Sequence, residues 1–308
     1  MRRVAREERL TDNPAASAAR IECLPDLGRR TLIMGILNVT PDSFSDGGLF
    51  ASFEAASAHA VELVAEGADI LDIGGESTRP GHTAVPADEE MARVLPVLRQ
   101  AVASVAAPIS IDTYKAVTAR AAFEAGARIL NDVWGLQREP EIARVAADFA
   151  APVIAMHNRE TVDGSLDIVE EMKAFFDRTL AIARAAGIPD GRIVLDPGIG
   201  FGKTFEQNLD ALRRLGDLKA LGFPLLVGTS RKSLIGKLLD KTPRERINGT
   251  IASNVMAIAN GADIIRVHDV LAHREAARIA DAIMGKDIMG TAKAGTAITG
   301  TAITGTER

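Results

Sequence analysis

Several short apolar runs in this chain end in a side chain that could bind a ligand or transfer a proton. The runs LIMGIL, ISI, IL and IVL lead into Asn38, Asp112, Asn131 and Asp196. A buried carboxylate needs hydrogen-bond donors, or it takes up a proton. A ligand that supplied those donors would carry adjacent N–H groups, as an aminated heterocycle does. The same oxygens could instead hold a divalent metal or form a carboxylate pair for acid–base catalysis, and the spacing does not choose among the three.

Basic side chains in the last third of the chain form a second candidate group. The segment VGTSRKSLIG places Lys232 and Ser233 where a helix begins, and the free N–H groups of a helix start favour anions. Ser233 could cap this helix or meet a carboxylate. The run IIRVH brings Arg266 and His268 to one side of a strand by alternation. An Arg and a His at one rim favour a phosphate or diphosphate clamp, although a lone strand His is more often structural.

Two loops rich in Gly, Pro and Ser follow the first two apolar runs. VTPDSFSDGG follows Asn38, and GGESTRPG contains Thr78 and Arg79. The Arg79 guanidinium suits a carboxylate or a phosphate, or it pairs locally with Glu76. Two such loops at one rim predict a mobile lid.

The elements that must position these residues follow a repeating pattern. Apolar runs alternate with Ala-rich amphipathic stretches, and Gly67, Gly126 and Gly261 punctuate the end of such stretches. This predicts an α/β protein, a single-domain (β/α)8 TIM barrel whose strand ends assemble the site. An open doubly wound sheet is the structural alternative, but it would gather its ligand at one switch point. The expected strands are Leu32–Val39, Ile70–Ile73, Ile109–Asp112, Ile129–Asp132, Val153–Met156, Ile193–Asp196, Leu225–Thr229 and Ile264–Val267.

Length and composition agree with one enzyme-sized domain. The chain has 308 residues, a formal net charge of −5 and one cysteine, Cys23. The acidic balance argues against a nucleic-acid partner, and no apolar stretch is long enough to span a membrane. A cytoplasmic location is expected. Residues 1–28 are interpreted as an extension, with a short strand at Ile21–Leu24 closing the barrel bottom. Residues 29–284 form the barrel, and residues 285–308 form a low-complexity tail with a tandem TAITG unit.

Taken together, these segments resemble the dihydropteroate synthase family of pterin-binding enzymes. The matching stretches are MGILNVTPDSFSDGG, GADILDIGGESTRPG, ISIDTYK, ILNDV, DPGIGFGK, VGTSRKSLIG and GADIIRVHDV. The resemblance implies that 6-hydroxymethyl-7,8-dihydropterin diphosphate condenses with 4-aminobenzoate to give 7,8-dihydropteroate and diphosphate, with Mg²⁺ as cofactor. It also implies a homodimer.

The resemblance also implies a substrate-binding or metal-binding role for individual residues. It implies that Asp112, Asn131, Asp196 and Lys232 hold the pterin ring and that Asn38 contacts the magnesium. The remaining implied substrate contacts are Thr78, Arg79, Met156, Phe201, Ser233, Arg266 and His268. Among them, Arg266 and His268 match the anion clamp, and Ser233 matches the group that meets the 4-aminobenzoate carboxylate. The loop from His157 to Gly164 has no match in the family pattern.

Two other functions remain as alternatives. One is a corrinoid methyltransferase that uses methyltetrahydrofolate and needs a cobalamin partner. The other is a non-catalytic pterin-binding barrel, which the loss of Asn38, Arg266 or His268 would have favoured.

Overall fold

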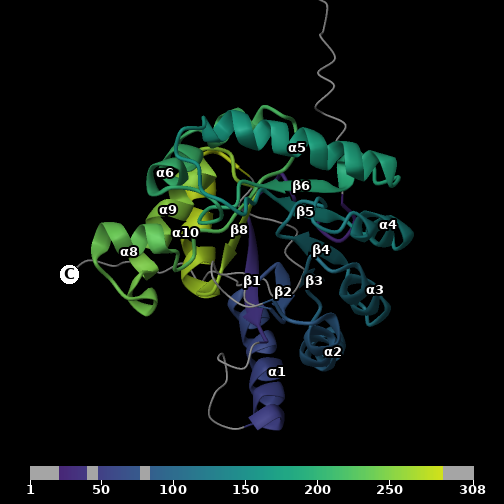
Figure 1. Cartoon of the computed structure of the whole chain (residues 1–308). Coiled ribbons are helices and arrows are strands. Elements are labelled where there is room, and N and C mark those ends of the chain that lie inside the picture. The colour runs from purple at the N-terminus through teal and green to yellow at the C-terminus, as the bar shows by residue number, and fades with distance from the viewer. Residues whose placement is uncertain (1–20, 40–47, 77–83, 287–308) are drawn as a thin grey trace, which may run out of the picture.

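Eight parallel strands form the centre of the protein. The computed structural model describes residues 21–39, 48–76 and 84–286 (Figure 1). The sheet order is β6-β5-β4-β3-β2-β1-β8-β7, and an isolated bridge between Leu195 and Leu225 joins the two outermost strands. The nearly closed barrel predicted from the sequence is confirmed. The strands are β1 (Leu32–Asn38), β2 (Ile70–Gly74), β3 (Ile109–Asp112), β4 (Ile129–Asp132), β5 (Val153–Met156), β6 (Ile193–Asp196), β7 (Leu226–Val227) and β8 (Ile264–Val267).

Helices surround the strands, as Figure 1 shows. They are α1 (Gly48–Glu66), α2 (Ala87–Ser104), α3 (Ala116–Glu124), α4 (Glu141–Asp148), α5 (Ile168–Ala185), α6 (Phe205–Arg213), α7 (Leu215–Lys219), α8 (Ser233–Leu239), α9 (Ile247–Ala259) and α10 (Val270–Ile283). The glycines that end α1, α3 and α9 have φ values of +107°, +108° and +108° at Gly67, Gly126 and Gly261. A glycine adopts this conformation at little cost, so each helix can end and turn into the next strand.

Alternation along each strand separates two apolar cores. The first core consists of side chains that pack between the strands and the helices, among them Ile33, Leu71 and Ile111. The other set points into the barrel, where Leu32, Met34, Ile70, Ile129, Ile154, Val194, Leu226 and Ile264 fill the lower part. Successive strand residues face opposite sides, so the next inward position along each strand lies nearer its carboxyl end. Those positions carry most of the polar residues of the site.

Residues 21–30 close the amino-terminal end of the barrel. Ile21 and Leu24 are buried against the inward apolar layer. The predicted strand at Ile21–Leu24 is wrong, because these residues form turns in which the Leu24 N–H donates to the Ile21 carbonyl over 2.8 Å. Turns are enough to close this end of the barrel, because apolar side chains fill its floor and no further strand is needed.

In the described ranges, no helix is long and apolar enough to cross a membrane. Of the predicted low-complexity tail, residues 285–308, the part from 287 onward lies outside the described residues.

Candidate functional site

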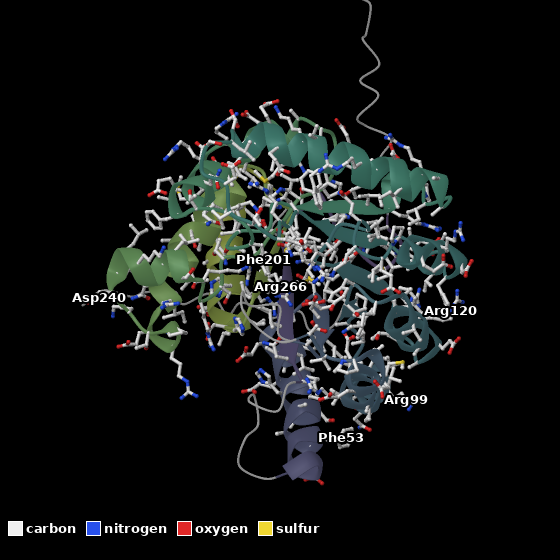
Figure 2. All side chains as sticks on the ribbon, in the orientation of Figure 1. Phe53, Arg99, Arg120, Phe201, Asp240 and Arg266 are labelled. Atoms are coloured by element: carbon white, nitrogen blue, oxygen red, sulfur yellow. The ribbon has the colours of Figure 1, made fainter. Side chains whose placement is uncertain are left out.

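A polar layer occupies the barrel interior at the carboxyl ends of the strands. It lies directly above the inward apolar layer and consists of Asp72 (β2), Ser110 and Asp112 (β3), Asn131 (β4), Asp196 (β6) and Arg266 (β8), which are largely buried. Figure 2 labels Arg266 and Phe201 near the middle of the molecule, in contrast to Arg99 and Asp240 at its periphery. This is the end at which (β/α)8 barrels place their active sites.

One network joins four strands across the barrel interior. The Arg266 Nε donates to Asp72 Oδ2 over 2.6 Å, and its Nη2 donates to Asp112 Oδ2 over 2.7 Å. The Asn131 amide donates to Asp72 Oδ2 over 3.0 Å. Because β1 lies between β2 and β8, and β3 lies between β2 and β4, these contacts cross the inside of the barrel. The structure therefore brings Asp112, Asn131 and Arg266 together, as expected.

Two carboxylates of this network keep one oxygen without a partner. Among the described residues, Asp72 Oδ1 and Asp112 Oδ1 are buried and make no hydrogen bond. Burial raises the pKa of Asp112 to about 7, opposed by the Arg266 guanidinium and reinforced by the Asp72 carboxylate. A buried acceptor without a donor is costly, so such atoms mark a place where a ligand can supply N–H groups.

Asp196 and Lys232 form the other side of the polar layer. Asp196 Oδ1 accepts the Gly198 N–H over 2.7 Å, and burial raises the pKa of Asp196. The Lys232 Nζ donates to the Ile199 carbonyl and lies 4.0 Å from the centre of the Phe201 ring. Burial lowers the pKa of Lys232 to about 7, while the Asp196 carboxylate opposes that change. Met156 is buried at the end of β5, the strand beside β6.

The residues predicted to bind an anion lie at the rim above β7 and β8. His268 Nδ1 and Ser230 Oγ are 2.9 Å apart, and the His268 N–H also donates to Ser230 Oγ over 3.2 Å. Helix α8 begins at Ser233, as predicted, but Lys232 is its N-cap residue and no side chain caps it. Ser233 is exposed at this helix start.

The metal prediction depends on one residue at the tip of β1. Asn38 ends β1 beside Gly74 of β2, and its side chain is partly exposed. Within the described parts of the chain, no group of three or more His, Cys, Asp or Glu side chains could hold a metal ion. A single amide oxygen still fits Mg²⁺, which often keeps one or two protein ligands and takes the rest from phosphates and water.

Two predicted contacts, Thr78 and Arg79, lie outside the described residues. Asp72, in contrast, is a member of the network that the sequence reasoning missed. The sequence feature that could have revealed Asp72 is a lone carboxylate inside the apolar strand ILDIG, on the same strand face as Gly74. Asp132 follows Asn131 directly but has a structural role, because it accepts the N–H groups of Trp134 and Leu136, both over 2.8 Å.

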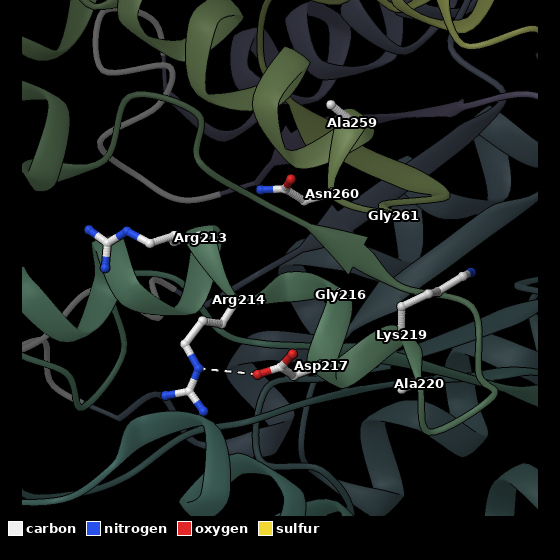
Figure 3. Close-up of a pocket in the computed structure, with 9 residues that line it drawn as sticks. All are labelled: Arg213, Arg214, Gly216, Asp217, Lys219, Ala220, Ala259, Asn260 and Gly261. Carbon is white, nitrogen blue, oxygen red and sulfur yellow. Dashed lines mark hydrogen bonds and ion pairs between the residues drawn. The ribbon is translucent and has the colours of Figure 1, made fainter.

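A surface groove lies away from this layer, beside the segments that lead into β7 and β8 (Figure 3). Arg213, Lys219 and Asn260 line it, together with Arg214, which is paired with Asp167, Asp210 and Asp217. Lys219 is paired with Asp263. These contacts stabilise the surface and leave no buried acceptor aimed into the groove.

Comparisons with known proteins agree with the fold. A family model described as pterin binding enzyme matches residues 34–268. A dihydropteroate synthase of Clostridium beijerinckii is 48% identical over 260 residues, which are 84% of this chain and 96% of the relative. The chain therefore belongs to the pterin-binding enzyme family, and within it to the dihydropteroate synthases.

Solved structures give the same result. A dihydropteroate synthase of Clostridium difficile, crystallised in the presence of pteroic acid, is 53% identical with a TM-score of 0.82, and the match covers 84% of this chain and 98% of that one. The enzyme of Xanthomonas albilineans in complex with 7,8-dihydropteroate is 44% identical with a TM-score of 0.76, covering 83% and 94%.

Proposed function

We propose that this chain is a dihydropteroate synthase. The reaction joins 6-hydroxymethyl-7,8-dihydropterin diphosphate to 4-aminobenzoate and releases diphosphate. The observation that carries this proposal is the pair of buried acceptors without donors, Asp72 Oδ1 and Asp112 Oδ1, within the polar layer at the barrel mouth. A pterin presents ring N–H and amino groups of the kind that these oxygens lack.

In the proposed reaction the C–O bond between the pterin methylene and the diphosphate breaks, and the arylamine nitrogen forms a new C–N bond there. The amine then loses a proton. The electron-rich pterin can carry positive charge as the diphosphate leaves. The carboxylates of Asp112 and Asp196 stabilise that charge from fixed positions, which is electrostatic preorganisation. Asn131 and Lys232 complete the contacts to the ring.

The departing diphosphate needs positive charge at the rim. We assign this role to Arg266 and His268, at the carboxyl end of β8. Arg266 already bridges Asp72 and Asp112, so its guanidinium links the ring site to the anion site. Ser233 and Phe201 would contact the 4-aminobenzoate.

We propose that Asn38 holds Mg²⁺ together with oxygens of the diphosphate. The bound ion would neutralise charge on the leaving group. If this is correct, a chelator abolishes turnover and added Mg²⁺ restores it. Full turnover in chelator would contradict the magnesium assignment.

We also propose a homodimer formed through α9 and α10, which pack side by side. Both helices expose large apolar side chains: Met256 is 59% exposed, Ile279 65% and Ile283 81%. Apolar side chains gathered on neighbouring helices are typical of a protein interface. A second copy of this chain is the proposed partner. Light scattering should give twice the chain mass for the native protein and the chain mass for Ile279→Asp. A native monomer would contradict the proposal.

The decisive experiment follows diphosphate release by the purified protein in a coupled assay. Release that requires both the pterin diphosphate and 4-aminobenzoate supports the synthase. Methyl transfer from methyltetrahydrofolate to a cobalamin protein would support the methyltransferase alternative. Pterin binding without either reaction would support the non-catalytic barrel. The cytoplasmic location expected from the sequence stays a prediction.

The order of binding is a second test of the proposed function. We expect 4-aminobenzoate to bind weakly until the pterin diphosphate or free diphosphate is present, because the rim closes over the first ligand. Calorimetry with and without diphosphate measures this. Tight binding of 4-aminobenzoate to the protein alone would contradict the expected order.

A further inference from the structure

A buried charged cluster lies behind the polar layer and is not used by the proposed reaction. His157 is fully buried just after β5, and Lys203 is 8% exposed just before α6. The Lys203 Nζ lies 2.7 Å from His157 Nδ1, and His157 Nε2 pairs with the Glu171 carboxylate of α5. An ammonium only donates, so Nδ1 accepts and Nε2 carries the ring hydrogen that is donated to Glu171.

Lys203 also holds the backbone of the loop that follows β6. Its Nζ donates to the Gly198 carbonyl over 2.9 Å and to the Phe201 carbonyl over 3.1 Å. This loop has positive φ values at Gly198 (+63°), Gly200 (+88°) and Gly202 (+56°). Three glycines within five residues give a segment with many accessible conformations. Its observed shape must therefore be stabilised by contacts from outside the loop.

The same loop carries the contacts that place Lys232. The Ile199 carbonyl accepts from the Lys232 Nζ, and the Phe201 ring lies under that ammonium. The lysine stem packs against Gly200, where an added Cβ would lie 2.9 Å from the Lys232 Cδ. The position of the Lys232 ammonium is therefore set by the loop, and Lys203 holds the loop on both sides of Ile199.

We propose that Lys203 is a positioning residue for the pterin site, which acts by fixing the loop that holds Lys232. His157 and Glu171 support it from behind: His157 orients the Lys203 ammonium and Glu171 fixes the ring of His157. The proposal depends on the role given to Lys232 under the proposed function. Lys203 itself need not touch the substrate.

A double-mutant cycle tests this coupling. The variants are Lys203→Met, Lys232→Met and the double variant, and the probe is 6-hydroxymethylpterin, whose Kd is measured by calorimetry. Lys203→Met should weaken binding about tenfold, which is about 1.4 kcal/mol. In the Lys232→Met background the same change should have less than a threefold effect, because the loop then has no ammonium left to place. Lys173 of α5 is partly exposed and pairs with Glu170, so Lys173→Met is the matched control and should bind within twofold of the native protein.

The outcomes separate the two proposals. If Lys232→Met binds like the native protein, the role of Lys232 is wrong and the positioning proposal falls with it. If Lys232→Met weakens binding but Lys203→Met does not, the positioning proposal alone is overturned. Equal effects of Lys203→Met in both backgrounds also overturn it, since Lys203 would then act by another route.

A second variant keeps the proposal testable if Lys203→Met does not fold. Glu171→Leu removes the partner at the outer end of the cluster, where the Glu171 side chain is 21% exposed. We expect binding to weaken about threefold, and this effect should disappear when Lys232→Met is added. Native-like binding by Glu171→Leu would overturn the supporting role of the cluster.

Discussion

The two ends of the barrel use the same residue types for opposite purposes. At the amino-terminal end, Asp69 accepts from Arg30 over 2.7 and 2.9 Å and from the Ile33 N–H over 2.8 Å. Asp281 there accepts from both the N–H and the hydroxyl of Thr31, each over 2.7 Å. At the carboxyl-terminal end, Asp72 and Asp112 each keep a buried oxygen that accepts no hydrogen bond from the described residues.

The difference shows how a chain separates stability from function. A carboxylate with its oxygens hydrogen-bonded stabilises the fold, and a ligand has nothing to add to it. A buried carboxylate with an unused acceptor costs stability until a ligand arrives with a donor. In this molecule Asp69 and Asp281 near the barrel floor are paired through both oxygens, although Asp26 beside them also keeps a buried oxygen without a hydrogen bond. At the other end Asp132 is fully paired, whereas Asp72 and Asp112 at the proposed pterin site are not.

The largest expected effect concerns the carboxyl-terminal end. Lys232→Ala and Asp112→Asn should each lower kcat/KM by more than tenfold, which is over 1.4 kcal/mol of barrier. Asp112→Asn removes a negative charge that stabilises the positive charge developing on the pterin, and Lys232→Ala removes a proposed contact to the ring. Steady-state kinetics with both substrates measures the loss. Native rates in both variants would show that the pterin site lies elsewhere.

The second largest effect is expected at the amino-terminal end of the barrel, where a substitution should lower stability without changing activity. Asp281→Ala leaves the buried Thr31 N–H and hydroxyl without an acceptor, which should cost about 3 kcal/mol of unfolding free energy. Thermal melting should fall by roughly 5 to 10 °C. The kcat per folded molecule should stay within twofold of the native value. A fall in kcat at unchanged stability would contradict the division between the two ends.

The pH dependence of activity should reflect the carboxyl-terminal end. Asp112 and Lys232 both have pKa values of about 7, the first raised and the second lowered by burial. Asp112 carries its negative charge beside the proposed pterin ring only when ionised, so activity should fall below its pKa. Lys232 carries its charge only when protonated, so activity should fall above its pKa. The profile of kcat/KM against pH should be a narrow bell near pH 7. Its acid and alkaline limbs report the titration of Asp112 and Lys232 as a coupled pair.

Asp112→Asn should remove the acid limb from the residual activity while keeping the alkaline limb. A profile that is flat from pH 5 to 9 in the native protein would contradict this assignment.

The smallest effect is expected at the surface groove beside β7 and β8. Arg213→Ala changes an exposed side chain that lines the groove and pairs with Asp210. Exposed ion pairs contribute little, so stability should change by less than about 1 kcal/mol. Activity should stay within twofold. A tenfold loss in kcat/KM would show that the comparison of the two barrel ends omits a functional region.

The sequence predicted the architecture closely because barrel strands are buried on both faces. Their near-continuous apolar runs are short and distinct, and the bounds of β3, β4, β5, β6 and β8 are those predicted. The prediction at β7 was too long, since the structure restricts this strand to Leu226–Val227. The extended strand expected at residues 21–24 is a set of turns, because a barrel floor needs apolar side chains there and no further ladder.

The site was predicted less completely. Asp112, Asn131 and Asp196 stand at strand ends, and that position alone indicated a role. Asp72 lies one step inside its strand. Lys203 ends the stretch DPGIGFGK but received no role from it, and His157 begins the loop that has no match in the family pattern. Their importance depends on partners between 14 and 194 residues away, such as Glu171 for His157 and Arg266 for Asp72.

By itself, the sequence determined which residues of each strand share a face, because alternation is a local property of a strand. It also determined the family, through long segments in a fixed order. Only the tertiary structure decided which carboxylates are satisfied and which keep a free oxygen. That outcome depends on donors contributed across the barrel by distant strands, and their distances are set when the sheet closes.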